Sequence, residues 1–233
     1  MTVSAVIPIK QLSDAKQRLG SLLSCSERTG LFRTMVEDVL TIVEVCPMVD
    51  EILVITSDVQ VADLAREYSC RVMPEPENAG LINAVTAAAA FLVSEGVESM
   101  LFLPGDVPLV SQDELEVVLD GMGQSESSEF SIVPARDMGG SNCIACSPPD
   151  CMTFGFGEDS FRRHLLIARA KGIVPNIVHL PGIGLDVDTP SDLEDLAGIM
   201  SSEGFKEEKG TYRYLVESGI LERLSSNLQE LNK

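Results

Sequence analysis

Short apolar runs alternate with amphipathic segments along most of this chain. Mainly apolar runs at 3–9, 51–56, 71–74 and 99–104 have the length and composition of buried strands. Segments with apolar residues at helical spacing follow them at 26–46, 58–68, 83–96 and 111–122. This repeated strand–helix order predicts an α/β fold in three layers (αβα), with helices on both faces of a mostly parallel sheet.

The second half of the chain breaks this strict alternation. Two strand-like runs at 130–135 and 142–147 follow each other without a helix between them, and a late strand is expected at 175–180. Helical spacing returns at 159–172 and 189–200. We therefore expect a mixed sheet in which most strands are parallel.

Several helix ends are marked in the sequence. Candidate N-caps are Ser26, Asp58 and Ser111, while Pro190 suits a first helical turn and Gly96 a helix C-terminus. Beyond about residue 204 the chain is charged, with apolar residues at helical spacing. We expect a main domain over residues 1–203 and a C-terminal helical extension over 204–233, whose apolar spacing favours a homodimer.

The charge of the chain excludes some classes of partner. The formal net charge is −19 over 233 residues, whereas nucleic-acid-binding proteins present a basic face, so we expect no nucleic-acid partner. Residues 1–33 differ from the rest, because five basic residues against two acidic ones give them a local net charge of +3. This segment is the first candidate for binding a small anion.

Apolar runs and cysteines indicate the compartment. No uninterrupted apolar run reaches about 18 residues, so we predict no membrane span. The first residues lack the charged region that precedes the apolar part of a signal peptide, so we expect a cytoplasmic protein with reduced thiols. Cys143 and Cys146 form a CxxC pair within an expected strand, where positions i and i+3 face opposite sides. We expect buried thiols there rather than half of a metal site.

Acidic residues follow two of the expected strands. The stretch LFLPGDVPLVS, at 101–111, places Asp106 between two prolines, and LDVD later brings Asp186 and Asp188. Ligands of open parallel sheets bind beyond the carboxyl ends of the strands, where three carboxylates would repel each other unless a cation such as Mg²⁺ or Mn²⁺ neutralised them. The alternative is structural, with Asp106 as a turn former and Asp188 as an N-cap.

Further polar segments lie at the same expected edge. Lys10 and Lys16, after the first strand, could bind a triphosphate or could be solvated surface lysines. The sequence has no P-loop or GxGxxG motif. Asn78, Gly80 and Asn83 suit either the edge of a base or a plain helix start. The glycines at 139, 140 and 157, with Ser141, Asn142 and Ser160, suit an anion near a helix N-terminus. We expect His164 to be a half-exposed helix residue rather than a catalyst.

Together these motifs resemble the 2-phospho-L-lactate guanylyltransferase family, nucleotidyltransferases of the glycosyltransferase-A-like fold (the Rossmann-like fold of nucleotide-diphospho-sugar transferases). The resemblance covers residues 2 to about 200 and rests on PIKQLSDAKQRL, SERTGLFRTMVEDVL, LPGDVPLVS, GGSN, FGFGEDSFRRH and LDVDTPSDL, in this order. Two segments depart from the family pattern. MGGSN has serine where threonine is usual, which leaves the acceptor open, and GLIN replaces a tighter GLN, which leaves open the residue that reads the base.

The resemblance implies a reaction and a set of residues. GTP and 2-phospho-L-lactate, or a related acid such as phosphoenolpyruvate, would give a lactyl-2-diphospho-guanosine and pyrophosphate, in coenzyme F-420 biosynthesis. The implied metal ligands are Asp106, Asp186 and Asp188, and Asp106, Lys16 and Lys10 would be catalytic. The implied nucleotide-binding residues are Lys10, Lys16, Arg18, Asn78, Gly80 and Asn83. The phosphorylated acid would be held by Ser141, Asn142, Gly157 and Ser160.

Three other interpretations stay open on the sequence alone. A cytidylyl- or sugar-phosphate nucleotidyltransferase would share the fold and differ in base and acceptor. A glycosyltransferase would use a metal-binding DxD, of which DVD at 186–188 is an example. A non-catalytic nucleotide-binding domain is the third interpretation. Among acceptors, 2-phospholactate, phosphoenolpyruvate and 3-phosphoglycerate differ too little for the sequence to separate them.

Overall fold

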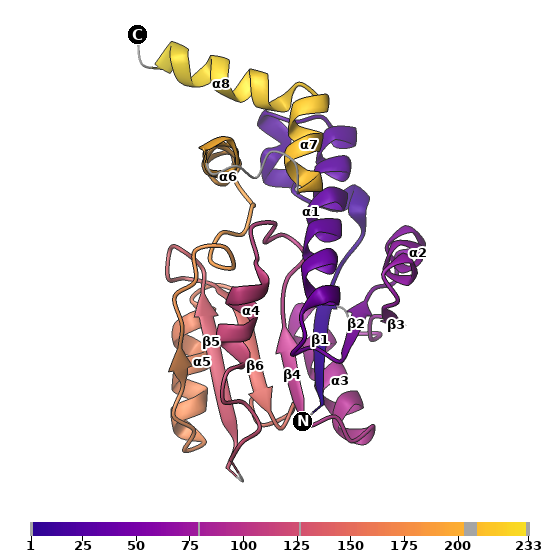
Figure 1. Cartoon of the computed structure of the whole chain (residues 1–233), viewed down its shortest axis with the longest axis vertical. Helices are drawn as coiled ribbons and strands as arrows, with labels where there is room; N and C mark the ends of the chain where they lie inside the picture. Colours follow the sequence, from indigo (N-terminus) through magenta and orange to yellow (C-terminus); the bar gives the residue numbers. More distant parts are fainter. Residues whose placement is uncertain (1, 79, 126, 203–208, 232–233) are drawn as a thin grey trace.

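The fold is built around one sheet. A computed structural model describes residues 2–78, 80–125, 127–202 and 209–231 (Figure 1). Across these residues the seven-stranded sheet has the order β3-β2-β1-β4-β6-β5-β7. The strands are β1 (Val3–Pro8), β2 (Glu51–Ile55), β3 (Arg71–Met73), β4 (Ser99–Phe102), β5 (Glu129–Pro134), β6 (Ser141–Ser147) and β7 (Asn176–Ile177). Among the strands that the structure describes, only β6 runs antiparallel to its neighbours, β4 and β5, so the expected mixed, mostly parallel sheet is confirmed.

Helices cover both faces of the sheet. The α-helices are α1 (Cys25–Val45), α2 (Val59–Glu67), α3 (Leu81–Ser94), α4 (Gln112–Leu119), α5 (Ser160–Ala170), α6 (Pro190–Ser202), α7 (Gly210–Glu217) and α8 (Ile220–Leu231), with the short 3-10 helices η1 (Leu12–Asp14) and η2 (Gln17–Ser21) after β1. Buried residues of α1, α2, α4, α6 and α7 form one apolar core, and those of α3 and α5 form a second. The two cores lie on opposite faces of the sheet, which confirms the three-layer αβα architecture.

The alternation of side chains along β6 separates these two cores. Cys143 belongs to the core under α1 and α4, and Cys146 to the core under α3 and α5. Both thiols are fully buried, and burial raises the pKa of each. The prediction that this CxxC pair faces opposite sides of a strand is therefore confirmed.

The N-cap of α1 differs from the prediction. Ser24 caps the helix, rather than Ser26, because only Ser24 has a glutamate three residues later at the third helical position. The Ser24 hydroxyl accepts a hydrogen bond from the Glu27 N–H, and the Glu27 carboxylate accepts one from the Ser24 N–H. This reciprocal pair is a capping box. Asp58 and Ser111 cap α2 and α4 as expected.

The C-terminal helices pack on the beginning of the chain. In Figure 1, α7 lies alongside α1 and α8 leads away from the sheet. Both carboxylate oxygens of Asp38, within α1, accept hydrogen bonds from the backbone N–H groups of Gly210 and Thr211 at the start of α7. Leu215 is buried in the same core as α1. The predicted division between residues 203 and 204 falls within 203–208, outside the described residues, and stays a prediction.

None of the helices that the structure describes is both long enough and apolar enough to cross a bilayer.

Candidate active site

The site lies at the edge of the sheet where the parallel strands end. β1 and β4 are parallel neighbours, so Lys10, after β1, and Asp106, after β4, leave the sheet at the same edge. The Val187 N–H donates a hydrogen bond of 3.1 Å to the Asp106 carbonyl oxygen. This contact joins two segments that are 81 residues apart in the numbering and brings the acids of LDVD to Asp106.

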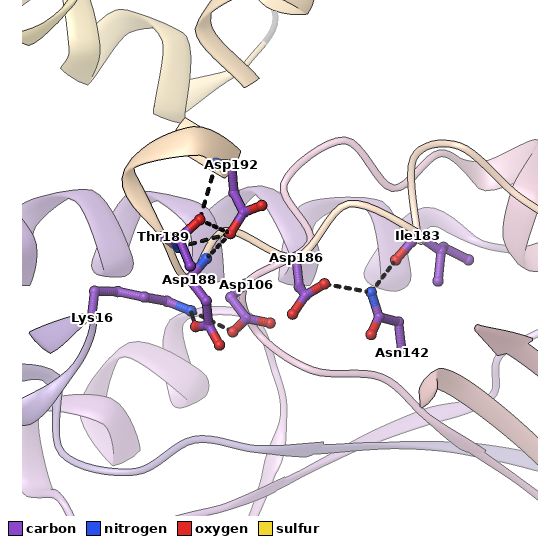
Figure 2. A network of polar contacts seen from close by, with 8 residues as sticks. All are labelled: Lys16, Asp106, Asn142, Ile183, Asp186, Asp188, Thr189 and Asp192. Carbon is purple, nitrogen blue, oxygen red and sulfur yellow. Dashed lines mark hydrogen bonds and ion pairs between the residues drawn. The ribbon is translucent and has the colours of Figure 1, made fainter. Parts of the chain in front are cut away.

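Lys16 bridges two of the predicted acids (Figure 2). Its Nζ atom lies 2.5 Å from Asp106 Oδ2 and 2.7 Å from Asp188 Oδ1, and its side chain is only 4% exposed. Burial disfavours the charged ammonium, but the two carboxylates outweigh this cost, so the pKa of Lys16 is raised above its usual value. The ammonium also lies 5.5 Å from the centre of the Phe32 ring. Lys16 therefore stays positively charged at the centre of the site.

Two carboxylate groups at this centre lack a full set of partners. Asp106 Oδ1 is buried and has no hydrogen-bond partner among the described residues. Asp186 accepts a 3.0 Å hydrogen bond from the Asn142 side-chain amide, which also donates to the Ile183 carbonyl. Burial, and then the charges of Asp106 and Asp188, raise the pKa of Asp186 against the opposing effect of the Asn142 hydrogen bond. Asp106 and Asp186 therefore each have a carboxylate oxygen that could accept a further contact.

These acids do not form a closed metal-binding cluster. Within the described ranges, no group of three or more His, Cys, Asp or Glu residues has the spacing to hold a metal ion. Asp106 and Asp188 meet at Lys16, while Asp186 is held by Asn142 (Figure 2). The unpartnered oxygen of Asp106 and the raised pKa of Asp186 nevertheless suit a divalent cation that prefers oxygen ligands.

Asp188 is not the N-cap of α6, which was the structural alternative for this residue. Thr189 caps the helix, since its Oγ1 accepts from the Asp192 N–H, while the Asp192 carboxylate accepts from the N–H groups of Asp188 and Thr189. Pro190 begins α6 as predicted. Asp106 does lie in a turn, but its carboxylate contacts Lys16. Both side chains are thus directed to the site.

Two cavities meet at these residues. The first, of about 460 Å³, is lined by Lys10, Lys16, Gly80, Asp106 and Asp188, together with apolar residues that include Phe32, Leu81 and Phe102. The second, of about 700 Å³, is lined by Arg18, Arg136, Gly139, Gly140, Gly157, Asp186 and Asp188, among others. Asp188 lines both cavities, so a ligand in each would meet beside it.

Four of the six predicted nucleotide-binding residues line these cavities, whereas Asn78 and Asn83 are on neither described wall. Lys10, Lys16 and Gly80 line the first cavity, whereas Arg18 lines the second. Asn83 lies in the first turn of α3, because the helix begins at Leu81 and not at residue 83. Its side-chain amide donates a 2.9 Å hydrogen bond to the Asn78 carbonyl, and both asparagines are exposed.

The residues predicted to hold the acid substrate lie at or near the second cavity, but only Gly157 belongs to its described wall. Gly157 is on its wall, and Ser141 and Ser160 are buried next to it with their hydroxyl oxygens 3.3 Å apart. His164 completes this buried group and is fully buried, so the expectation of a half-exposed residue is wrong. The spacing of Phe161, His164 and Ala168 already places all three on one helical face, and this signal could have shown the burial.

Sequence comparison places the chain among guanylyltransferases. Residues 3–226 match the family described as "Guanylyl transferase CofC like". The chain is 34% identical to a phosphoenolpyruvate guanylyltransferase of Conexibacter woesei, over 87% of this chain and 90% of that protein. It is 32% identical to a 3-phospho-D-glycerate guanylyltransferase of Colwellia psychrerythraea (86% and 94%). It is also 31% identical to a 2-phospho-L-lactate guanylyltransferase of Methanothermobacter thermautotrophicus (88% and 87%).

Comparison with solved structures agrees on the fold. A putative nucleotide-diphospho-sugar transferase of Desulfovibrio desulfuricans G20 superposes with a TM-score of 0.76, at 18% identity, over 96% of this chain and 98% of that chain. This likeness confirms the predicted nucleotide-diphospho-sugar transferase fold. The family match supports the guanylyltransferase interpretation rather than the cytidylyl, sugar-phosphate or non-catalytic alternatives. The chain belongs to the CofC-like guanylyltransferase family.

Proposed function

We propose that this enzyme transfers the guanylyl group of GTP to the phosphate of a small phosphorylated acid, 2-phospho-L-lactate or phosphoenolpyruvate, in coenzyme F-420 biosynthesis. The observation that supports this proposal most directly is the meeting of two cavities at Asp188, with Lys16 and Asp106 beside it. GTP fits the first cavity, since apolar residues can contact a base and two lysines can contact phosphates. The acid fits the second cavity, whose glycines allow close approach of a small anion.

The proposed step needs no general base. A phosphate monoester is largely ionised near pH 7, so its oxygen can attack the α-phosphorus of GTP directly. A bond forms between that oxygen and the α-phosphorus, the bond between the α-phosphorus and the bridging oxygen to the β-phosphorus breaks, and pyrophosphate leaves with the electron pair. The main barrier is the approach of two anions, so catalysis rests on positioning and charge neutralisation.

The basic residues of the two cavities would supply much of this neutralisation. Lys10 and Lys16 would offset the charge of the triphosphate and of the departing pyrophosphate. Arg18 and Arg136 are the arginines on the described wall of the second cavity, where the anionic acid would bind. Arg136 is 53% exposed and 2.5 Å from Asp195 of α6, so it is reachable from solvent and already oriented.

A divalent cation fits the acids of the site. Mg²⁺ or Mn²⁺ would be held by Asp106, Asp186 and Asp188, and when bound it supplies positive charge against both substrates. The unpartnered Asp106 oxygen and the raised pKa of Asp186 support this assignment. The homodimer and the cytoplasmic location stay predictions, which size-exclusion chromatography with light scattering and cell fractionation would test.

Pyrophosphate release tests the proposed reaction. GTP, ATP, CTP and UTP would each be offered with Mg²⁺ and with 2-phospho-L-lactate, phosphoenolpyruvate or 3-phosphoglycerate. We expect release with GTP and with one or more of the first two acids, and its loss in Asp106→Asn. Asp150→Asn is the matched control, because the exposed Asp150 follows antiparallel β6 and lies at the opposite edge of the sheet. Turnover with CTP in preference to GTP would refute the proposal.

A further inference from the structure

His164 of α5 is a buried polar residue that the proposed reaction does not yet use. It is 0% exposed, and its ring packs against that of Phe156 in a T-shaped arrangement, with 5.0 Å between the ring centres. An apolar residue would fill this position without the cost of burying a polar ring. Both ring nitrogens instead have partners: Nδ1 lies 2.9 Å from Ser141 Oγ, and Nε2 lies 2.8 Å from the Gly155 backbone nitrogen.

These two contacts determine which ring nitrogen of His164 carries the proton. A backbone N–H can only donate, so His164 Nε2 accepts from Gly155. The neutral ring must then hold its proton on Nδ1, from which it donates to Ser141 Oγ. Burial, with the charge of Arg163 adding to it, lowers the pKa of His164 to about 4, so the ring stays neutral in this tautomer at physiological pH.

Both acceptor sites of the Ser141 hydroxyl oxygen are consequently occupied by hydrogen-bond donors. It accepts from His164 Nδ1–H and, at 3.3 Å, from the Ser160 hydroxyl. A hydroxyl oxygen has two acceptor sites and one proton, so Ser141 keeps only its own proton to offer. His164 and Ser160 thus convert a hydroxyl that could accept or donate into one that donates.

Ser141 lies next to the second cavity. A register shift between β5 and β6 pairs Val133 with Cys143 but Pro134 with Ser141, so Asn142 is the extra residue of a β-bulge. Ser141 follows directly on Gly139 and Gly140, which line the second cavity, and Ser160 is tied to Gly157 of the same wall by a backbone hydrogen bond. The cluster of Ser141, Ser160 and His164 therefore lies beside that cavity, and Ser141, at 8% exposed, is the least buried of the three residues.

We propose that His164 is a positioning residue for the phosphorylated acid, which holds the Ser141 hydroxyl as a dedicated hydrogen-bond donor to an anionic oxygen of that acid. This inference rests on the proposed function and adds a residue that never touches the substrate itself. A donor whose orientation is fixed in advance loses little freedom on binding, and a hydrogen bond to a charged oxygen is among the stronger ones.

Two amide substitutions separate the contacts of His164. In His164→Asn, the amide nitrogen takes the place of Nδ1 and keeps the donation to Ser141, but the contact with Gly155 is lost. In His164→Gln, the amide oxygen reaches the place of Nε2 and keeps the acceptance from Gly155, but the donation to Ser141 is lost. A purely structural role for His164 gives no reason for these matched variants to differ in the binding of the acid.

The measurement is the KM for the acid and for GTP, in wild type, both variants, Ser141→Ala and the double variant Ser141→Ala/His164→Gln. We expect His164→Gln and Ser141→Ala each to raise the KM for the acid about 10-fold or more, with the KM for GTP unchanged. We expect His164→Asn to stay within about threefold of wild type. In the Ser141→Ala background, His164→Gln should add less than about twofold, because His164 acts through Ser141.

A packing control and a binding assay complete the experiment. Phe156→Leu disturbs the ring that packs on His164 without touching its hydrogen bonds, so it should lower the melting temperature and leave the KM for the acid unchanged. Equal losses in His164→Asn and His164→Gln, or fully additive losses in the double variant, would overturn the inference.

Calorimetric titration with phosphoenolpyruvate and 2-phospho-L-lactate separates this inference from the proposed function. If wild type binds an acid but releases no pyrophosphate, the proposed reaction fails, and the same comparison of variants is made on the Kd. If wild type binds neither acid, the inference fails as well, because its ligand is wrong.

Discussion

The buried ring of His164 predicts a specific loss of stability in mild acid. In the unfolded chain this histidine has an ordinary pKa of about 6.5, whereas burial and Arg163 lower it to about 4 in the native protein. Between these values the unfolded state binds more protons than the native state, so the free energy of unfolding must fall as pH falls. The contribution is fully present above pH 6.5 and is lost as the pH approaches 4.

The size of this loss follows from the shift in pKa. At about 1.4 kcal/mol per pH unit, a pKa lowered from 6.5 to about 4 corresponds to about 3 kcal/mol in total. Roughly 2 kcal/mol of this is already lost between pH 7 and pH 5. The ring is fully buried, so solvent does not screen the effect substantially.

Urea unfolding of wild type and His164→Asn at pH 7, 6 and 5 measures the contribution of His164 to the free energy of unfolding. Asparagine does not titrate, and the carboxylates titrate in both proteins, so the difference between the two curves isolates His164. We expect wild type to lose about 2 kcal/mol more than the variant between pH 7 and pH 5, with equal m-values. Parallel losses in the two proteins would refute the buried, neutral state of this ring.

Three further predictions concern the site and the C-terminal helices. A Cβ at Gly30 would clash with the Tyr214 hydroxyl group, so Gly30→Ala should lower the free energy of unfolding by about 1–3 kcal/mol, and Tyr214→Ala in the same chain should relieve part of this loss in urea unfolding. Lys16→Met removes the ammonium group between Asp106 and Asp188, so kcat should fall by about 100-fold or more. Added Mn²⁺ should then raise the melting temperature of this variant more than that of wild type. Asn142→Ala frees the Asp186 carboxylate, so kcat/KM should fall about 10-fold with the KM for GTP unchanged in steady-state assays; an unchanged kcat/KM would contradict the positioning of Asp186 by Asn142.

The sequence predicts the edge of the sheet at which the site lies, because that inference depends on local patterns. Apolar runs mark the strands, and the rule for parallel sheets places whatever follows them at one edge. Lys10, Asp106 and the LDVD acids could therefore be placed together before any geometry was known. The same reasoning predicts the opposite orientation of Cys143 and Cys146, since it depends only on the alternation within one strand.

Long-range contacts could not be predicted in this way. Lys16 is 90 and 172 residues from its two partners, and its burial between them depends on how η1 and η2 pack after β1. Arg18, two residues later, faces the second cavity because the same short helices turn the chain there. The burial of His164 was missed for a different reason: its helical spacing indicated it, but histidines in helices are more often half-exposed.

The central claim is that the phosphate of the acid attacks the α-phosphorus of GTP, and phosphorus NMR of the reaction mixture tests it most directly. Wild type would be incubated with GTP, Mg²⁺ and either 2-phospho-L-lactate or phosphoenolpyruvate. We predict equal amounts of pyrophosphate and of a product with two mutually coupled phosphorus signals, one from the acid and one from GTP, and neither in Asp106→Asn. Formation of GDP, or of GMP whether or not the acid is present, would contradict the proposed reaction.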